Sequence, residues 1–315
     1  MRTPTWLTTI LVLACTSTFV AAGCVGEEPI TPSVTDGGSA GDGGSSGDSG
    51  SSGDGGSSGD GGSSSGGDGA SDAAIAWNPG KIPGLALWVD AEDTTTLTLG
   101  VGNKVSEWRD KSGASNHAKG PGGVEPIREV NATLGKNVVR FAGGSQVLKV
   151  EDSGSLQFQS VDEFVVAAVV DHSHTGTGGF VAKTNFPTNN EGILLFTIST
   201  ENLCFALDAN CDTITFSRGK FHRVISRRMA GGLETRTWVD GSEVKVRTVA
   251  TPVDVSAGGR PLLLGANRFD GTTVTEGMTG DIAEVVVYHT GATSTPITTA
   301  QLKDLDAYFQ KKWGL

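Results

Sequence analysis

Short runs of apolar residues, alternating or continuous and separated by Gly, Asn, Asp and Pro, recur from about Trp77 to Leu315. Typical runs are LALWVDA (85–91), NVVRFAG (137–143), EFVVAAVVD (163–171) and GILLFTIS (192–199). About a dozen such runs at close spacing, with almost no helical periodicity between them, predict antiparallel β-strands. The roughly 235 residues of this region suit one large two-sheet sandwich.

One hairpin is predicted with particular clarity in the segment 235–246, TRTWVDGSEVKV. Polar and apolar positions alternate up to Val239, and the alternation resumes at Val244. Between them lie Asp240 and Gly241, a pair that tolerates positive φ and favours a tight turn between antiparallel strands.

The last 20 residues change to a helical pattern. Thr298 as N-cap with Gln301 three residues later predicts a capping box. An apolar stripe follows at helical spacing, and Gly314 is a typical helix end. The residues of the stripe are Leu302, Leu305, Phe309 and Trp313. The pattern predicts one C-terminal helix that lies against the sandwich.

The first 23 residues have the layout of a secretory signal peptide. Arg2 precedes an apolar run from about Leu7 to Ala22, which is short and interrupted for a membrane span. The run ends in Ala-Ala-Gly followed by Cys24, which resembles the lipobox of bacterial lipoproteins. That resemblance implies acylation of Cys24; ordinary signal cleavage with an incidental cysteine is the alternative. Val25 after the cysteine favours the outer membrane, by analogy with known lipoproteins.

Residues 24–76 are predicted to be a disordered tether. The stretch 36–72 is a loose repeat of Ser, Gly and Asp without aromatic or branched apolar residues, so it has nothing to bury. As a flexible coil it would span roughly 30 to 35 Å.

Charge is divided unevenly between tether and domain. The chain carries a net charge of -11, but nine of its 35 acidic residues and only one of its 24 basic residues precede Lys81. The remaining part, 77–315, is therefore close to neutral and lacks the basic surface that nucleic-acid binding requires.

Motifs at both ends of the region carry a family resemblance. IPGLALWVDAEDTTTLTL (82–99), KVSEWRDKSGASNHA (104–118), NVVRFAGG (137–144) and the ending from Gly280 resemble the LamG-like jelly roll of the concanavalin A-like lectin/glucanase superfamily. The resemblance implies an all-β jelly-roll sandwich over nearly all of 82–315. Its members include lectins, glycan-cleaving enzymes and adhesion modules.

Hydrolase activity is not expected. Glucanases of this fold place two carboxylates at alternate positions of one strand, because retaining hydrolysis needs them about 5 Å apart. Asp90, Glu92 and Asp93 lie at a strand end, and Asp281 and Glu284 are three residues apart, so neither set matches that pattern.

No cofactor is required by this sequence, but calcium is a candidate. LamG-like domains often bind calcium through oxygen ligands from rim loops, and Asp110, Asp270 and Asp281 are the residues that could contribute. His172 and His174 could also form a metal pair, although a glycine-rich loop follows them at once.

The cysteines predict one disulfide. Cys15 leaves with the signal peptide and Cys24 would be acylated, so Cys204 and Cys211 remain in the domain, on either side of a predicted turn. A disulfide is the default in an exported chain, and two buried thiols are the alternative.

Two loops supply the ligand-binding candidates. TNFPTNNEG (184–192) contains Asn185, Phe186, Asn189 and Asn190, and GANRFDG (265–271) contains Asn267, Arg268, Phe269 and Asp270. Aromatic rings and amide groups in loops can stack on sugars and hydrogen-bond to them, whereas ordinary loop chemistry is the alternative.

These features together favour a lipid-anchored binding module that recognises a glycan or a matrix polymer at the outer membrane or cell surface. Membrane contact would be through the lipid alone. The alternative is a structural or protein-adhesion domain of the cell envelope without a sugar ligand, which would share every feature except the binding pocket.

Overall fold

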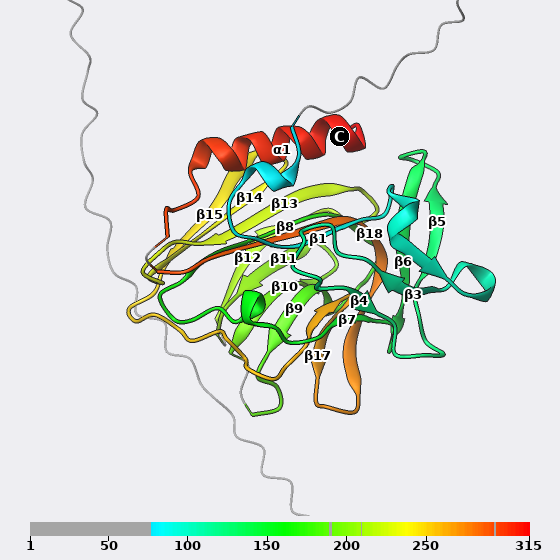
Figure 1. The fold of residues 1–315 in the computed structure, drawn as a ribbon, viewed down its shortest axis with the longest axis horizontal. Helices are drawn as coiled ribbons and strands as arrows, with labels where there is room; N and C mark the ends of the chain where they lie inside the picture. Colours follow the sequence, from blue (N-terminus) through cyan, green and yellow to red (C-terminus); the bar gives the residue numbers. More distant parts are fainter. Residues whose placement is uncertain (1–76, 189–190, 209, 293) are drawn as a thin grey trace, which may run out of the picture. The chain divides into compact units, whose positions relative to one another are not determined.

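Two antiparallel sheets of nine strands each face one another across a hydrophobic core in the computed structural model (Figure 1). The structure describes residues 77–188, 191–208, 210–292 and 294–315. The predicted signal peptide 1–23, Cys24 and the tether up to residue 76 lie outside the described residues. The described part confirms the predicted all-β sandwich with one C-terminal helix.

The first sheet is built around one long strand, β18 (Val274–Thr290). Its main path is β15 (Ser242–Thr248), β14 (Glu234–Val239), β13 (His222–Arg228), β8 (Glu163–His172), β18, β6 (Lys136–Gly144) and β5 (Ile127–Asn131). Two further strands also pair with β18: β1 (Leu85–Asp90) and β17 (Ala266–Phe269).

The second sheet begins at a disulfide-linked hairpin and ends in short strands. Its order is β12 (Cys211–Thr215), β11 (Asn202–Ala206), β10 (Gly192–Ser199), β9 (Gly178–Thr184), β16 (Leu262–Leu264), β7 (Leu148–Val150), β4 (Ala118–Lys119), β3 (Val105–Trp108) and β2 (Leu97–Leu99). Four 3₁₀ turns complete the description: η1 (Pro79–Lys81), η2 (Thr94–Thr96), η3 (Val101–Asn103) and η4 (Gly154–Leu156).

Strand β8 shows why part of the sequence is continuously apolar. Val166, Ala168 and Val170 face the core between the sheets, while Val165 and Val169 face the other side, beneath the C-terminal helix. Both faces of the strand are therefore covered, which removes the polar alternation expected of a half-exposed strand.

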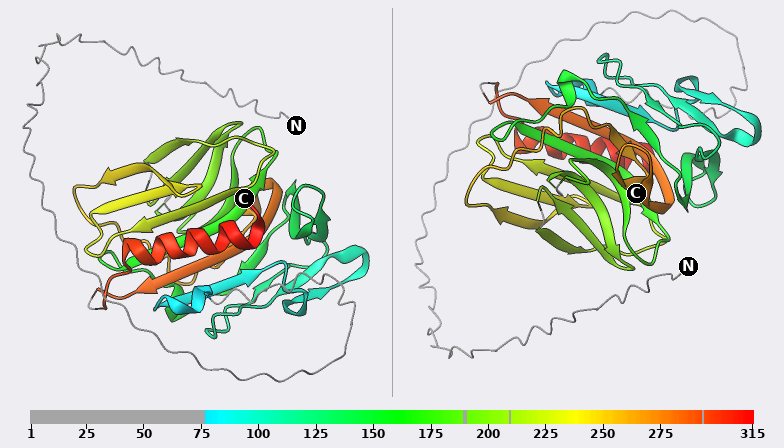
Figure 2. Two further views of the ribbon diagram at one scale, coloured as in Figure 1. Left: turned by 90° about the horizontal axis from the view of Figure 1, so that it is seen from above. Right: turned by 90° about the horizontal axis from the view of Figure 1, so that it is seen from below.

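The helix α1 (Thr299–Trp313) forms as predicted and lies along the first sheet (Figure 2, left). Thr298 and Gln301 make the reciprocal capping box, and Gly314 ends the helix with φ of 70°. All four residues of the predicted stripe are buried in the second hydrophobic cluster, which α1 forms with the sheet. No helix among the described residues is long and apolar enough to cross a membrane.

The predicted turn at Asp240 and Gly241 joins β14 to β15, with φ of 51° and 82° at the two residues. Positive φ at both positions matches the right-handed twist of the two strands.

The apolar run RPLLLGAN (260–267), short enough for a single strand, contributes to two strands in different sheets. Leu262–Leu264 belongs to the second sheet and Ala266–Phe269 to the first, and Gly265 lies between them with φ of 88°. A side chain at Gly265 would overlap the ring of Phe141. Because only glycine fits this point, the chain can cross between the sheets here.

Candidate functional site

The hairpin of β17 and the start of β18 is positioned by close backbone contact with β9. A Cβ atom on Gly179 would overlap the backbone of Ala266, and one on Gly178 would lie 3.0 Å from the Cα of Met278. Two adjacent glycines therefore let the hairpin approach β9 more closely than any other residues would. This contact fixes one of the two predicted ligand loops against the second sheet.

Both predicted ligand loops meet at this hairpin. The guanidinium carbon of Arg268 lies 5.2 Å from the ring centroid of Phe186, which follows β9. The Nη1 atom of Arg268 also lies 3.1 Å from Oε1 of Glu276. We call Lys149, Phe186, Asn267, Arg268, Phe269 and Glu276 the hairpin cluster.

Asn267 is the most buried polar member of the hairpin cluster. Its side chain is 1% exposed, and its Nδ2 donates a hydrogen bond of 2.6 Å to Oε2 of Glu276. Its Oδ1 is buried without a hydrogen-bond partner among the described residues. Glu276 has φ of 57°, a costly conformation for a residue with a side chain. The strained Glu276 thus holds Asn267 and Arg268 together and leaves one amide acceptor unused.

Phe269 joins the hairpin to the outer face of the second sheet. Its ring packs against an apolar cluster on that face, and Nζ of Lys149 lies 3.6 Å from the ring centroid. Burial lowers the pKa of Lys149, although the charge of Glu151 opposes this. The apolar row beneath runs through the cross-strand neighbours Leu263, Ala182 and Leu194.

The hairpin cluster combines the features of a site for a polar, uncharged or weakly charged ligand. Two cations lie against aromatic rings, one carboxylate bridges an amide and a guanidinium, and a buried amide oxygen needs a donor. Planar polar side chains beside apolar ring surface can hydrogen-bond to hydroxyl groups while packing against C–H groups.

The other predicted loop residues have structural partners or are not described. The backbone N–H of Asn185 donates to the carbonyl of Glu191 and closes the loop. Asn189 and Asn190 lie outside the described residues. Asp270 is exposed at the hairpin tip, where backbone N–H groups of Thr273 and Thr272 lower its pKa.

The three carboxylates predicted for calcium do not share a site. Asp110 accepts hydrogen bonds from backbone N–H groups, Asp270 caps the hairpin tip, and Asp281 is bound by Arg140 through two bonds of 2.7 Å. Within the part of the chain that the structure describes, no group of three or more His, Cys, Asp or Glu residues could hold a metal ion. Each of the three carboxylates already has hydrogen-bond donors of its own in a different part of the fold.

His172, considered as half of a metal pair, is a core residue. It is fully buried, and its ring stacks on Phe216 with a centroid distance of 5.3 Å. Burial lowers the pKa of His172. The ring of His172 therefore packs in the core, where both of its nitrogens are buried without a hydrogen-bond partner among the described residues.

One further pair of carboxylates lies on two different strands, so no spacing within a single strand could indicate it. Asp281 and Asp171 are direct cross-strand partners of β18 and β8, and both line a cavity of about 370 Å³. Burial and the charge of Asp281 raise the pKa of Asp171. Asp281, however, is 2% exposed and bound by Arg140 and Asn131, so it has no free oxygen to attack a substrate.

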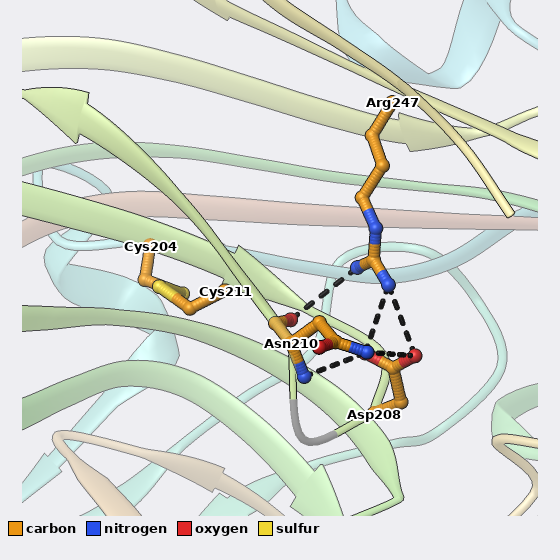
Figure 3. Close-up of a disulfide and its surroundings, with 5 residues drawn as sticks. All are labelled: Cys204, Asp208, Asn210, Cys211 and Arg247. Atoms are coloured by element: carbon orange, nitrogen blue, oxygen red, sulfur yellow. Dashed lines mark hydrogen bonds and ion pairs between the residues drawn. A yellow bond between two sulfur atoms is a disulfide. The ribbon is translucent and has the colours of Figure 1, made fainter. Parts of the chain in front are cut away.

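The predicted disulfide is present between Cys204 and Cys211, with a Cα–Cα distance of 5.6 Å (Figure 3). It links β11 to the first residue of β12 and encloses the turn that carries Asp208 and Asn210. The sequence indicated the turn but not the role of these two polar residues.

The fold resembles those of several solved structures. A mutant of Trypanosoma rangeli sialidase displaying trans-sialidase activity is 15% identical, with a TM-score of 0.50 over 73% of this chain and 33% of that chain. The binding domain of Paraclostridial Mosquitocidal Protein 1 is 10% identical, with a TM-score of 0.50 over 72% of this chain and 52% of that chain. At these identities, both likenesses establish the fold alone.

A third structure, the Ruminococcus gnavus IT-sialidase CBM40 bound to alpha2,3 sialyllactose, is 11% identical, with a TM-score of 0.42 over 54% of this chain and 95% of that chain. The chain spans about a third of the sialidase chains that it matches. No protein-family model matches the sequence, and no curated protein matches it.

Proposed function

We propose that residues 77–315 form a carbohydrate-binding module and that the hairpin cluster is its binding site. One observation carries the proposal: Arg268 packs on Phe186 from the other predicted loop while Glu276 holds Arg268 beside the buried Asn267. A sugar presents hydroxyl groups that both donate and accept, and C–H faces that pack on rings. The hairpin cluster offers donors in its guanidinium and ammonium groups, acceptors in its amide and carboxylate oxygens, and two aromatic rings.

The unused Oδ1 of Asn267 supports this assignment. A buried amide oxygen without a donor costs about 1 to 3 kcal/mol, so a ligand hydroxyl or a bridging water that reaches it removes that cost. The strained backbone of Glu276 is a second cost concentrated at the same place. Unpaired buried polar atoms and strained backbone angles that occur together at one surface hairpin are typical of binding sites.

The proposal includes display at the outer membrane or cell surface. Acylation of Cys24 would anchor the chain, and the acidic tether 24–76 would let the domain reach a glycan or matrix polymer. Metabolic labelling with a fatty-acid probe tests the anchor. Wild-type protein should be labelled and Cys24→Ser should not; equal labelling of both would contradict the proposed anchor.

A glycan array with and without added calcium tests the binding function. The matched pair is Arg268→Ala and Arg236→Ala, because the two arginine side chains are 34% and 36% exposed and both pair with glutamate. We expect Arg268→Ala to lose at least tenfold in affinity and Arg236→Ala to bind as wild type does.

Three outcomes would contradict the proposal. Absence of binding in both calcium conditions favours a structural or adhesion domain. Equal binding by wild type and Arg268→Ala places the site elsewhere. Release of reducing sugar from a bound glycan would show hydrolysis.

A further inference from the structure

The two sheets leave a groove where their edge strands approach each other. β15 is the last strand of the first sheet and β12 the last strand of the second, and each has a ladder partner on one side only. The groove has a volume of about 560 Å³. Polar side chains that line it include those of Asp208, Asn210, Lys245, Arg247 and Thr248. We call it the edge groove.

We propose that the edge groove is a second binding site, separate from the hairpin cluster, that takes a carboxylate-bearing saccharide chain. The saccharide class rests on the proposed function of the domain. The preference for a carboxylate rests on the groove alone.

Strand register directs two cations to the same side of β15, toward the second sheet. Lys245 and Arg247 are the cross-strand partners of Thr237 and Thr235, whose side chains are buried. Val244 and Val246 alternate with these cations and are more than 40% exposed, and Val246 also contributes to the lining of the groove. The alternation of the strand therefore places both positive charges at the groove.

Arg247 reaches from β15 to Asp208 and Asn210, in the turn between β11 and β12 (Figure 3). Its Nη2 lies 3.0 and 2.9 Å from the two carboxylate oxygens of Asp208, and its Nη1 donates to the carbonyl of Asn210 at 3.3 Å. Burial would raise the pKa of Asp208, but hydrogen bonds from Asn210 and Arg247 outweigh it and hold that pKa below its usual range. Asp208 is thus ionised and fully engaged.

Some hydrogen-bond donors of the edge groove have no acceptor among the described residues. None of these bonds involves the Nε–H of Arg247, and Lys245 forms no ion pair or hydrogen bond with any residue that the structure describes. Since the Asp208 carboxylate is bound by Arg247 and Asn210, no acidic side chain that the structure describes compensates the charge of Lys245. An acceptor-rich anionic group is the complement of such a site.

The disulfide supports this geometry. Cys204–Cys211 links the two strands on either side of the turn that carries Asp208 and Asn210, the two partners of Arg247 (Figure 3). A cross-link across so short a segment reduces the conformations open to the turn. A turn held in place before the ligand arrives loses less conformational entropy on binding. Opening the disulfide should therefore weaken binding at the edge groove and leave the hairpin cluster unaffected.

Calorimetry with uronic acid oligomers tests the proposal. The probes are oligogalacturonate and the same oligomer with every carboxylate methyl-esterified. We expect wild type to bind the acid form at least tenfold more tightly than the ester, and the difference to shrink as salt is raised. Equal affinity for the two forms would overturn the assignment, and so would tighter binding of poly-glutamate, which would make the ligand a peptide.

Lys245→Gln and Lys136→Gln are the matched variants, since both lysines are partly exposed on strands and neither side chain forms a hydrogen bond or ion pair with a described residue. Lys245→Gln should lose at least tenfold in affinity for oligogalacturonate, whereas Lys136→Gln should not change. Unchanged affinity of Lys245→Gln would overturn the proposal.

Two further variants separate this site from the proposed function. Arg268→Ala should retain oligogalacturonate binding, and Cys204→Ala/Cys211→Ala should weaken it several-fold without changing the array profile that depends on Arg268. Loss of oligogalacturonate binding in Arg268→Ala would assign it to the hairpin cluster and overturn the second site. If array ligands bind through Arg268 but oligogalacturonate does not bind wild type, the proposed site at the edge groove is wrong. The proposed site at the hairpin cluster is then unaffected.

Discussion

Lys312 of the C-terminal helix and Glu284 of β18 form a buried ion pair, with 2.8 Å between Nζ and Oε2. Glu284 is completely buried, and it also accepts hydrogen bonds from Trp88, Tyr308 and Trp313. Burial raises the pKa of Glu284, and the charge of Lys312 opposes that rise. The ion pair attaches the helix to the sheet. Because the Glu284 carboxylate is cut off from water, the hydrogen bonds from its protein donors must replace its hydration.

We expect Lys312→Met to lower the free energy of unfolding by about 3 to 5 kcal/mol, because it leaves a carboxylate buried without its cation. Urea denaturation measures the change. Lys311→Met, one position earlier and exposed, is the control and should change stability by less than about 0.5 kcal/mol. Equal effects of the two variants would show that the ion pair does not attach the helix.

Asp110 is expected to matter for stability and not for ligand binding. Its carboxylate accepts from the backbone N–H groups of Trp88, Ser112 and Asn116 at 2.8 to 2.9 Å, so it joins the turn after β3 to β1. Asp110→Ala should cost about 2 to 4 kcal/mol, since several donors lose their acceptor together. Thermal unfolding and the glycan array measure the two properties.

Asp270→Ala is the comparison for Asp110→Ala. Asp270 also accepts from two backbone N–H groups, but at an exposed hairpin tip where water can replace the carboxylate. Its loss should cost less than about 1 kcal/mol. An Asp110→Ala protein with wild-type stability and no ligand binding would mean that this turn is itself the binding site.

The hairpin of β17 and β18 lies so close to β9 that we expect Gly179 to be required for the hairpin cluster. Gly179→Ala would force the backbone of Ala266 away, at a cost of about 1 to 3 kcal/mol, and move Asn267 and Arg268 from their partners. Affinity on the array should fall with stability. Gly154→Ala, where a Cβ would meet nothing within 4 Å, should leave affinity unchanged.

We expect the buried imidazole of His172 to cause part of the loss of folding stability at low pH. Because burial lowers its pKa, the unfolded chain binds a proton near pH 6.5 that the folded chain does not. Stability therefore falls as pH decreases from about 6.5, by at most about 1.4 kcal/mol per pH unit from this residue. His172→Phe, which keeps the stack on Phe216, should be less destabilised between pH 7 and pH 5 in urea titrations.

His174→Phe is the matched variant for that experiment, because His174 is partly exposed two residues along the chain. The carboxylates contribute the same pH dependence to every variant, so the comparison isolates the imidazole. A pH dependence of His172→Phe identical to that of wild type would rule out the buried histidine as its source.

The disulfide should contribute about 2 to 3 kcal/mol, because it closes a short loop in the unfolded chain. Cys204→Ala/Cys211→Ala tests this by urea denaturation. A thiol assay on denatured, unreduced protein should find neither cysteine reactive. Two reactive thiols besides any at Cys24 would contradict the cross-link between Cys204 and Cys211.

Local patterns in the sequence determined much of this fold. The capping box at Thr298, the turn at Asp240 and the pairing of the last two cysteines all depend on residues within a few positions of each other. Continuous apolar runs identified the central strands of a sandwich. The short polar strand Ile127–Asn131 was missed, because an exposed edge strand has little apolar alternation to detect.

Only the tertiary structure decided which side chains meet. Phe186 and Arg268 belong to loops that the sequence identified separately, and their contact depends on the close approach of the hairpin to β9. Asp208 meets Arg247 because two edge strands of different sheets converge. The alternation of a strand indicates which face a side chain occupies but not which strand lies beside it. The partner strands are chosen by packing of the whole core, so the local sequence alone did not identify these contacts.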